Sequence, residues 1–142
     1  MVPMKRFFQI LFSSALFGSL LAAEPEHMVP PMVNYQGRLA NATGSAFPTA
    51  DYELTFRIWS TNTDGVLIWG PQVFDGGSEL GHGAKVPVVQ GYFNVVLGPA
   101  DTNGISLADA LTNSACFVEV AVSNRPPILP RQQILSSPYA LV

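Results

Sequence analysis

The alternation of apolar and polar side chains between residues 51 and 60 restricts the fold more than any other feature of the chain. In the stretch Asp-Tyr-Glu-Leu-Thr-Phe-Arg-Ile-Trp-Ser, an apolar residue recurs at every second position. Side chains on a β-strand point alternately to two faces, so this pattern predicts a half-buried strand. Its apolar face would carry Tyr52, Leu54, Phe56 and Ile58. A second layer must cover that face because water solvates apolar surface poorly.

Length and composition favour a single all-β domain. The chain has 142 residues, of which 48% are hydrophobic and 12% charged, and it contains 12 Gly and 12 Pro. This balance is too apolar for a disordered chain and too rich in turn residues for a helical bundle. A chain of this length forms one domain that buries roughly two-thirds of its unfolded surface.

Several further segments have the pattern of short strands separated by turns. Asp64-Gly65 predicts a hairpin between the central strand and residues 66–69. The other expected strands are residues 32–39, 86–89, 92–98 and 116–123, followed by an extended end at 128–142. Residues 86–89 and 92–98 should form a second hairpin, and 92–98 should also pair with 32–39, where Gly37 indicates a bulge or a point where two backbones come close. Residues 106–109 have the pattern of a capping box and predict a helical turn. The expected fold is an immunoglobulin-like antiparallel β-sandwich of about six or seven strands with one short helical turn, which we favour over a barrel.

The first 31 residues precede the predicted domain. Lys5 and Arg6 stand before an apolar run over residues 7–22, which is typical of a secretory signal peptide over 1–23. An uncleaved membrane anchor is the alternative. Residues 24–31 form a Pro-rich tether, and 32–142 form the sandwich domain. The protein is therefore expected to be secreted or held at the cell surface, with membrane contact only through the leader.

Charge and cysteine content exclude some partners and linkages. Removal of the leader leaves five basic and ten acidic residues, so nucleic acid is an unsuitable partner. Cys116 is the single cysteine, so no disulfide can form within the chain. It is in phase with Val118 and Val120, and the alternation indicates a buried thiol.

Two loops contain residues that suggest metal or acid-base chemistry. Asp75, Glu79 and His82 cluster in a glycine-rich loop, but a flexible first shell without a fourth ligand favours a solvated connection. The stretch 101–104, Asp-Thr-Asn-Gly, resembles the start of a calcium loop, yet Thr112 stands where the bidentate Glu would be needed. We therefore predict a plain turn there, and no catalytic, metal or cofactor residue anywhere in the chain.

Three aromatic residues are candidates for ligand binding. Trp59 and Trp69 flank the first hairpin loop, and Tyr92 begins a later strand. The two tryptophans could form a platform that stacks sugars, and a carbohydrate-binding role could also use Tyr92, whereas the alternative for the tryptophans is ordinary packing within and between strands. We favour packing for the two tryptophans because such residues beside turns are usually buried.

Two motifs near the limits of the predicted domain carry a family resemblance. They are Asn34-Tyr-Gln-Gly-Arg-Leu39 and Pro130-Arg-Gln-Gln-Ile-Leu-Ser-Ser-Pro-Tyr-Ala-Leu141. With them, the chain resembles the amino-terminal β-sandwich domain of secreted bacterial tail-fibre-like and cell-surface proteins. The motif residues are Asn34, Tyr35, Gln36, Gly37, Arg38, Pro130, Arg131, Gln132, Pro138 and Tyr139. The resemblance implies a module that precedes a fibre or stalk, and it brings no catalytic residues.

The motif arginines have a structural and a functional interpretation. Arg38 and Arg131 could hydrogen-bond backbone carbonyls or a carboxylate such as Glu53 or Glu119, which would tie the two chain ends to one edge of the sandwich. Alternatively, an arginine beside a motif tyrosine could bind a sugar or an acidic polymer.

These observations favour a non-enzymatic exported module with a structural or adhesive role at the bacterial cell surface, such as the base of a fibre or stalk. Its partner would be a cell-surface or extracellular polymer or protein, including a glycan, and no cofactor is expected. The second interpretation is a carbohydrate-binding module that uses Trp59, Trp69 or Tyr92. A hydrolase ranks third, because residues for nucleophilic or metal catalysis are absent or poorly placed.

Overall fold

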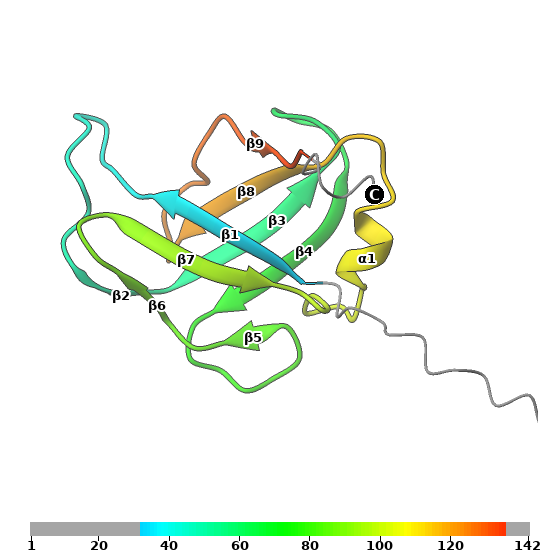
Figure 1. Cartoon of the computed structure of the whole chain (residues 1–142), viewed down its shortest axis with the longest axis horizontal. Coiled ribbons are helices and arrows are strands. Elements are labelled where there is room, and N and C mark those ends of the chain that lie inside the picture. Colours follow the sequence, from blue (N-terminus) through cyan, green and yellow to red (C-terminus); the bar gives the residue numbers. More distant parts are fainter. Residues whose placement is uncertain (1–31, 136–142) are drawn as a thin grey trace, which may run out of the picture.

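A computed structural model of the chain describes residues 32–135, which form an all-β sandwich with one short helix (Figure 1). The strands are β1 (Val33–Arg38), β2 (Ala50–Tyr52), β3 (Leu54–Trp59), β4 (Leu67–Phe74), β5 (His82–Gly83), β6 (Val86–Val88), β7 (Tyr92–Leu97), β8 (Phe117–Val122) and β9 (Gln132–Gln133), and the helix is α1 (Leu107–Ala110). The all-β prediction is confirmed. The predicted leader at 1–23 and tether at 24–31, together with Pro138 and Tyr139, lie outside the described residues.

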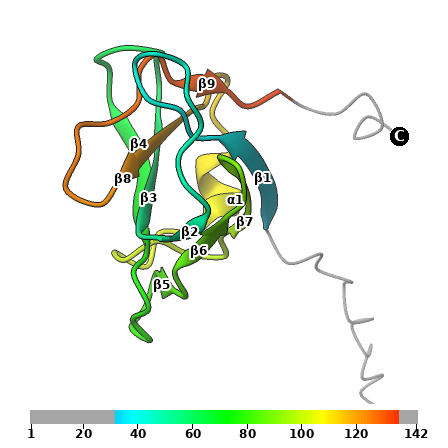
Figure 2. The same cartoon turned by 90° about the vertical axis from the view of Figure 1, so that its left-hand side faces the viewer.

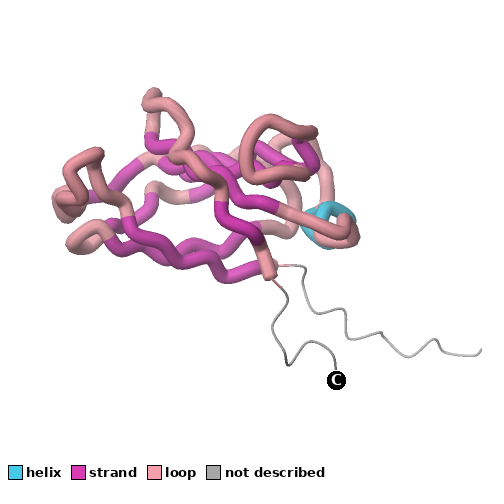
Figure 3. The backbone as a smooth tube through the Cα atoms, turned by 90° about the horizontal axis from the view of Figure 1, so that it is seen from above, coloured by secondary structure: helices cyan, strands magenta, loops and turns pink. Residues whose placement is uncertain are grey.

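The strands form two layers. The larger sheet has the order β5-β4-β3-β8-β9, and the pair β1-β7 lies across it, with the short pair β2-β6 at one side (Figures 1 and 2). The view from above separates the two layers of strands and shows α1 at one end (Figure 3). All neighbouring strands are antiparallel except β4 and β5. The described residues contain more strands than expected because the predicted strand over 51–60 divides into β2 and β3, and because the short strand β5 was not predicted.

The predicted central strand is present, but it is shorter than the pattern suggested. Leu54, Phe56 and Ile58 are fully buried in β3, as the alternation predicts. The prediction of one continuous strand over 51–60 is wrong, because the chain changes sheets at Glu53 and Tyr52 pairs with Val86 in the smaller pair. The Tyr52 ring packs on Phe47, and its hydroxyl donates to the Pro48 carbonyl at 2.8 Å. These contacts hold the tyrosine away from the larger sheet.

The two predicted hairpins have different outcomes. β3 and β4 pair across the loop that contains Asp64 and Gly65, both at positive φ, so the first hairpin is confirmed. The second is reduced to one bridge between Val89 and Tyr92 around the predicted turn. β6 pairs instead with β2, since Pro87 has no N–H to give to a second neighbour. β7 pairs with β1 along its whole length, as the sequence predicted.

The core between the layers is aromatic at its centre. The Phe56 ring lies 5.7 Å from Tyr35, 5.5 Å from Phe74 and 6.2 Å from Phe93, measured between centroids. The Tyr35 and Phe74 contacts are edge-to-face, the geometry that the ring quadrupoles favour. Each such side chain, when fully buried, contributes about 1.5–3 kcal/mol through the hydrophobic effect. Cys116 is buried as predicted, and burial raises the pKa of its thiol.

The helical turn α1 follows Ser106, which has the extended backbone of an N-cap. The helix is confirmed, but the predicted capping box is wrong because the Ser106 side chain makes no capping hydrogen bond. Burial of Leu107 and Ala110 against the sheets holds the turn instead. Within residues 32–135, no helix has the length and apolarity that crossing a membrane requires.

Phe56→Ala should lower the free energy of unfolding by about 3–5 kcal/mol, because it removes the ring that packs on three others and leaves a cavity. Thr55→Ala, on the opposite face of β3, should cost under about 1 kcal/mol. Urea unfolding of both variants measures the difference. Equal losses would contradict burial of only one face of β3, and a larger loss for Thr55→Ala would contradict the observed register, since a one-residue slip exchanges the two faces.

Candidate functional site

The outward side of β1 and β7 is the best candidate for a binding surface. Three cross-strand pairs project from it, and they are Asn34 with Val96, Gln36 with Asn94, and Arg38 with Tyr92. All six residues are exposed. In Figure 1 the strands β1 and β7 lie in front of the larger sheet. We call these six residues the β1–β7 face. Alternation within residues 92–98 already indicated that Tyr92, Asn94 and Val96 share a side, but only the register with β1 joins them to the first motif.

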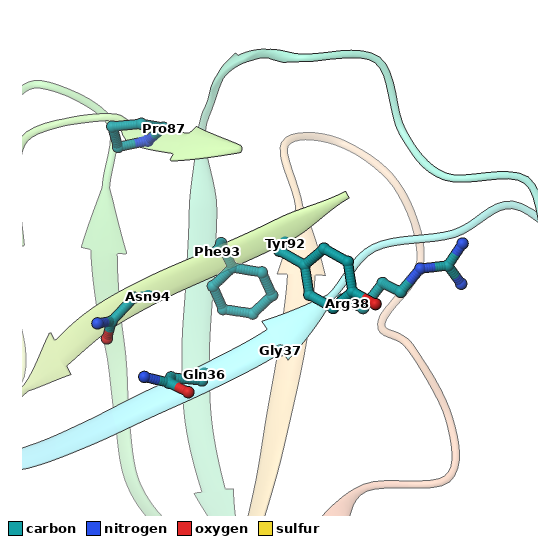
Figure 4. A pocket seen from close by; sticks show the side chains of 7 residues that line it. All are labelled: Gln36, Gly37, Arg38, Pro87, Tyr92, Phe93 and Asn94. Carbon is teal, nitrogen blue, oxygen red and sulfur yellow. The ribbon is translucent and has the colours of Figure 1, made fainter. Parts of the chain in front are cut away.

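A shallow groove of about 690 Å³ crosses this face. Its described lining residues are Gln36, Gly37, Arg38, Pro87, Tyr92, Phe93 and Asn94. Gln36 and Asn94 lie near each other at one part of the groove, and the Tyr92 ring lies beside the Arg38 side chain at another (Figure 4). No sequence pattern indicated that Pro87 belongs to this groove, because its position depends on the strand β6 beside β7.

Gly37 shapes the groove from within. It pairs with Phe93 in an uninterrupted register, so the predicted bulge is absent. A Cβ at Gly37 would stand 2.7 Å from the tip of the Phe93 ring, so any side chain there would displace this core aromatic. The close approach at Gly37 is therefore one between a backbone and a ring, and not the approach of two backbones that the sequence suggested.

The polar groups of the β1–β7 face are largely unengaged. The Arg38 guanidinium carbon lies 6.0 Å from the Tyr92 ring centroid, and one terminal nitrogen donates to the Gly44 carbonyl at 3.3 Å. Gln36 and Asn94 make no side-chain hydrogen bond to another residue in the described part of the chain. Tyr92 is 62% exposed. The face therefore offers an aromatic ring, the three carboxamides of Asn34, Gln36 and Asn94, and most guanidinium donors to a ligand.

The two tryptophans do not belong to this surface, so the favoured interpretation, packing, fits both of them, and the alternative of a tryptophan platform for sugars does not. Trp69 is fully buried and donates from Nε1 to the Ile105 carbonyl at 2.9 Å. Trp59 is half-buried on the far side of the larger sheet, where the Arg131 guanidinium carbon lies 4.2 Å from its ring centroid. Of the three candidates, only Tyr92 remains accessible.

Arg131 has a structural role on the outer side of the larger sheet. Its Nε donates to Glu119 Oε2 at 3.1 Å, the carboxylate contact that the sequence suggested. One terminal nitrogen donates to the carbonyls of Thr61, at 3.0 Å, and Asp64, at 2.6 Å. Arg57 also faces Glu119, at 3.7 Å. Arg38 makes no comparable contact with a carboxylate in the described residues, so the two motif arginines do not act as a pair.

The two motifs nevertheless meet. The Tyr35 hydroxyl donates to Gln132 Oε1 at 2.8 Å, which joins β1 to β9 across the open edge of the sandwich. Pro130 and Gln132 line a small cavity beside Tyr35 at this edge. Burial raises the pKa of the Tyr35 hydroxyl, so the neutral donor persists over a wide pH range.

Asp101, the first residue of the calcium-like stretch, is fully buried and organises its own loop. Its Oδ2 accepts from the Gly70 N–H at 2.8 Å, and its Oδ1 accepts from the N–H groups of Asn103 and Ile105 at 2.9 Å each. Both carboxylate oxygens are thus occupied by backbone donors. The prediction of a turn without calcium fits this arrangement, although the sequence did not predict burial of the carboxylate.

Asp75, Glu79 and His82 do come together. His82 Nδ1 lies 3.0 Å from Asp75 Oδ1, and His82 Nε2 lies 3.7 Å from Glu79 Oε2. Each ring nitrogen faces a carboxylate, so this cluster suits a doubly protonated imidazole better than a metal ligand. Within the described residues, no group of three or more such side chains has the arrangement to hold a metal ion. The loop is less solvated at His82 than predicted, since that side chain is only 20% exposed.

The pair has opposite pKa shifts with one main cause. The hydrogen bond to Asp75 raises the pKa of His82 above 6.5, and the same bond, with a second from the Gly77 N–H, lowers the pKa of Asp75 below 3.8. The His82 contribution to stability is complete below pH 6.5 and is lost as pH rises through its raised pKa. The Asp75 contribution is complete above pH 3.8 and is lost as pH falls through its lowered pKa.

The His82 ring should therefore titrate above pH 6.5 in a nuclear magnetic resonance experiment. Asp75→Asn should move that midpoint down toward the ordinary value, because the charged acceptor is gone. Asp64→Asn, an exposed change in another loop, should leave the midpoint unchanged. A His82 midpoint that is insensitive to Asp75→Asn would contradict the pairing.

Comparisons with known proteins place the chain in a family. No curated protein and no solved structure matches it. A family model described as a domain of unknown function (DUF8740) matches residues 34–131. The match begins in β1 at the first motif and ends at Arg131 in the second, so it includes the β1–β7 face and the larger sheet up to β9. The chain therefore belongs to the family of the domain of unknown function DUF8740.

Proposed function

We propose that this protein is a non-enzymatic, exported adhesion module at the bacterial cell surface, and that it binds an extracellular polymer through the β1–β7 face. The observation that carries the proposal is the exposed row of polar and aromatic side chains on two regular strands, with the carboxamides of Gln36 and Asn94 unengaged by other described residues. Groups on strands are held in fixed positions, so little ordering is needed when a ligand binds.

Export is supported by the sequence of the leader. Lys5 and Arg6 precede an apolar run that ends in small residues, the order that the secretion machinery recognises. Expression with the native leader should yield a product that begins near Glu24. Amino-terminal sequencing measures this, and a membrane-held product that begins at Met1 or Met4 would contradict it.

The proposal of a non-enzymatic role is supported by the contacts of three titratable side chains, which already pair with other groups of the protein. The Asp101 carboxylate is filled by three backbone donors, and Glu119 faces two arginines. His82 has a carboxylate at each ring nitrogen. A general base needs a free acceptor within reach of its substrate, and these groups lack one.

A role as the base of a fibre or stalk is a second candidate, favoured by the contact between the two motifs. The hydrogen bond from Tyr35 to Gln132 closes the sandwich where the described chain begins and ends. A base domain is pulled by the fibre that it carries, and a hydrogen bond between its first and last strands would help to resist their separation. The two roles are compatible, since this edge and the β1–β7 face use different side chains of β1.

Blocking the β1–β7 face should abolish adhesion. Asn94→Cys introduces a thiol at an exposed position. The native Cys116 is only 4% exposed, so the label should react at position 94. The exported chain, labelled at position 94 with a bulky maleimide, should lose retention on plates coated with polysaccharide extracted from a bacterial biofilm. The same label at Ser78→Cys, in an exposed loop outside the groove, should not reduce retention.

Retention of the chain labelled at position 94 at the unlabelled level would overturn the use of this face. No retention of the unlabelled chain would overturn adhesion to the polymer.

A further inference from the structure

We propose that the β1–β7 face recognises an acidic sugar unit of the uronic acid class, with its carboxylate at Arg38, its ring on Tyr92 and its hydroxyls at Gln36 and Asn94. This inference rests on the proposed function and specifies the ligand class of the same face.

The charge of the groove is the first argument. Arg38 is the one charged side chain among the described residues that line it, and the remainder are neutral. An arginine carries five N–H donors in a planar fork that matches a carboxylate, and the bond to Gly44 uses one terminal nitrogen. The other donors stay available for a bidentate contact. No lining carboxylate among the described residues opposes an anion, although the chain as a whole is acidic.

The exposed ring is the second argument. Tyr92 is 62% exposed, although its cross-strand neighbour Arg38 is long enough to cover an aromatic ring. A ring that is left open beside a guanidinium can receive a flat ligand with an apolar face and a charged edge. A pyranose has such a face in its axial C–H groups. A uronic acid adds a carboxylate at the edge of that ring.

The spacing of the polar groups is the third argument. Gln36 and Asn94 are directly opposite on neighbouring strands, which places their Cβ atoms about 5 Å apart. Gln36 and Arg38 are two residues apart on one strand, a separation of about 7 Å. Both distances are of the size of one sugar ring. Carboxamides both donate and accept, as adjacent hydroxyl groups do.

Rigidity is the fourth argument. The face belongs to a strand pair whose inner side chains, Tyr35 and Phe93, pack in the aromatic core 6.0 Å apart. Gly37 lies against the Phe93 ring and cannot accept a side chain without moving it. The outer side chains are therefore carried on a backbone that the core fixes, and preorganised groups bind with a smaller entropic cost.

The test uses tri-galacturonate and its methyl ester as probes, which share their rings and differ in charge. The exported chain should bind tri-galacturonate measurably in calorimetry and bind the ester at least about tenfold more weakly, as expected for loss of a charge-assisted pair. Arg38→Gln should reduce affinity for the acid by a similar factor and leave the ester nearly unchanged. Tyr92→Ala should weaken both ligands, and higher salt should weaken only the acid.

Two variants control for general effects. Leu80→Ala removes an apolar residue that is also 62% exposed, and Arg125→Gln removes an exposed arginine outside the groove. Neither should change affinity. Circular dichroism of each variant tests whether the fold is kept. The site is supported if the folded Arg38 and Tyr92 variants lose affinity and the two control variants do not.

Three results would overturn the inference. They are equal affinity for acid and ester, insensitivity to Arg38→Gln, and equal affinity for a poly-glutamate peptide, which would assign the face to acidic peptides. If plate retention depends on position 94 but tri-galacturonate does not bind, this ligand class is wrong and the adhesion proposal stands. If retention is absent as well, both are wrong.

Discussion

The packing of Phe56 against three other rings is the contact on which the rest of the structure depends. Phe56 comes from the larger sheet, whereas Tyr35 and Phe93 come from the strand pair that covers it, so this cluster joins the two layers. Without a disulfide in the described residues, packing must hold these layers together. The cluster also fixes the orientation of β1 and β7. Because the inward residues are held by the core, the outward residues of the proposed binding surface are carried on a fixed backbone.

Closure of the sandwich at its carboxyl-terminal edge uses a different kind of interaction. Arg131 and Glu119 have side chains that are 7% and 5% exposed, so both are desolvated. Burial of two charges costs several kcal/mol of desolvation free energy, which is similar in size to the free energy that their attraction contributes. The pair alone is therefore weak evidence for stability. One terminal nitrogen also donates to two loop carbonyls, and the guanidinium lies over the Trp59 ring. Removal of one partner would leave the other charge buried, so the pair specifies where the last segment docks.

Sequence periodicity could predict the features that are determined within a single strand, such as which of its faces is buried. Alternation gave the buried faces of β3 and β7 and the burial of Cys116. It could not give the change of sheet at Glu53, because that depends on the contacts of Tyr52 with Phe47 and Pro48. It also could not separate Trp69, which donates to the distant Ile105 carbonyl, from the exposed Tyr92. The β1–β7 face needs the register between strands that are more than fifty residues apart, and no local pattern contains that information.

The first motif can be understood as two interleaved sets of residues. Tyr35 and Gly37 point inward, where one bonds to Gln132 and the other makes room for Phe93. Asn34, Gln36 and Arg38 point outward and contribute nothing to the aromatic core. Because successive side chains on a strand alternate exactly, neither set can shift without exchanging places with the other. The same six-residue strand therefore carries both the fold and the proposed recognition, and the two can be changed independently only by substituting alternate positions.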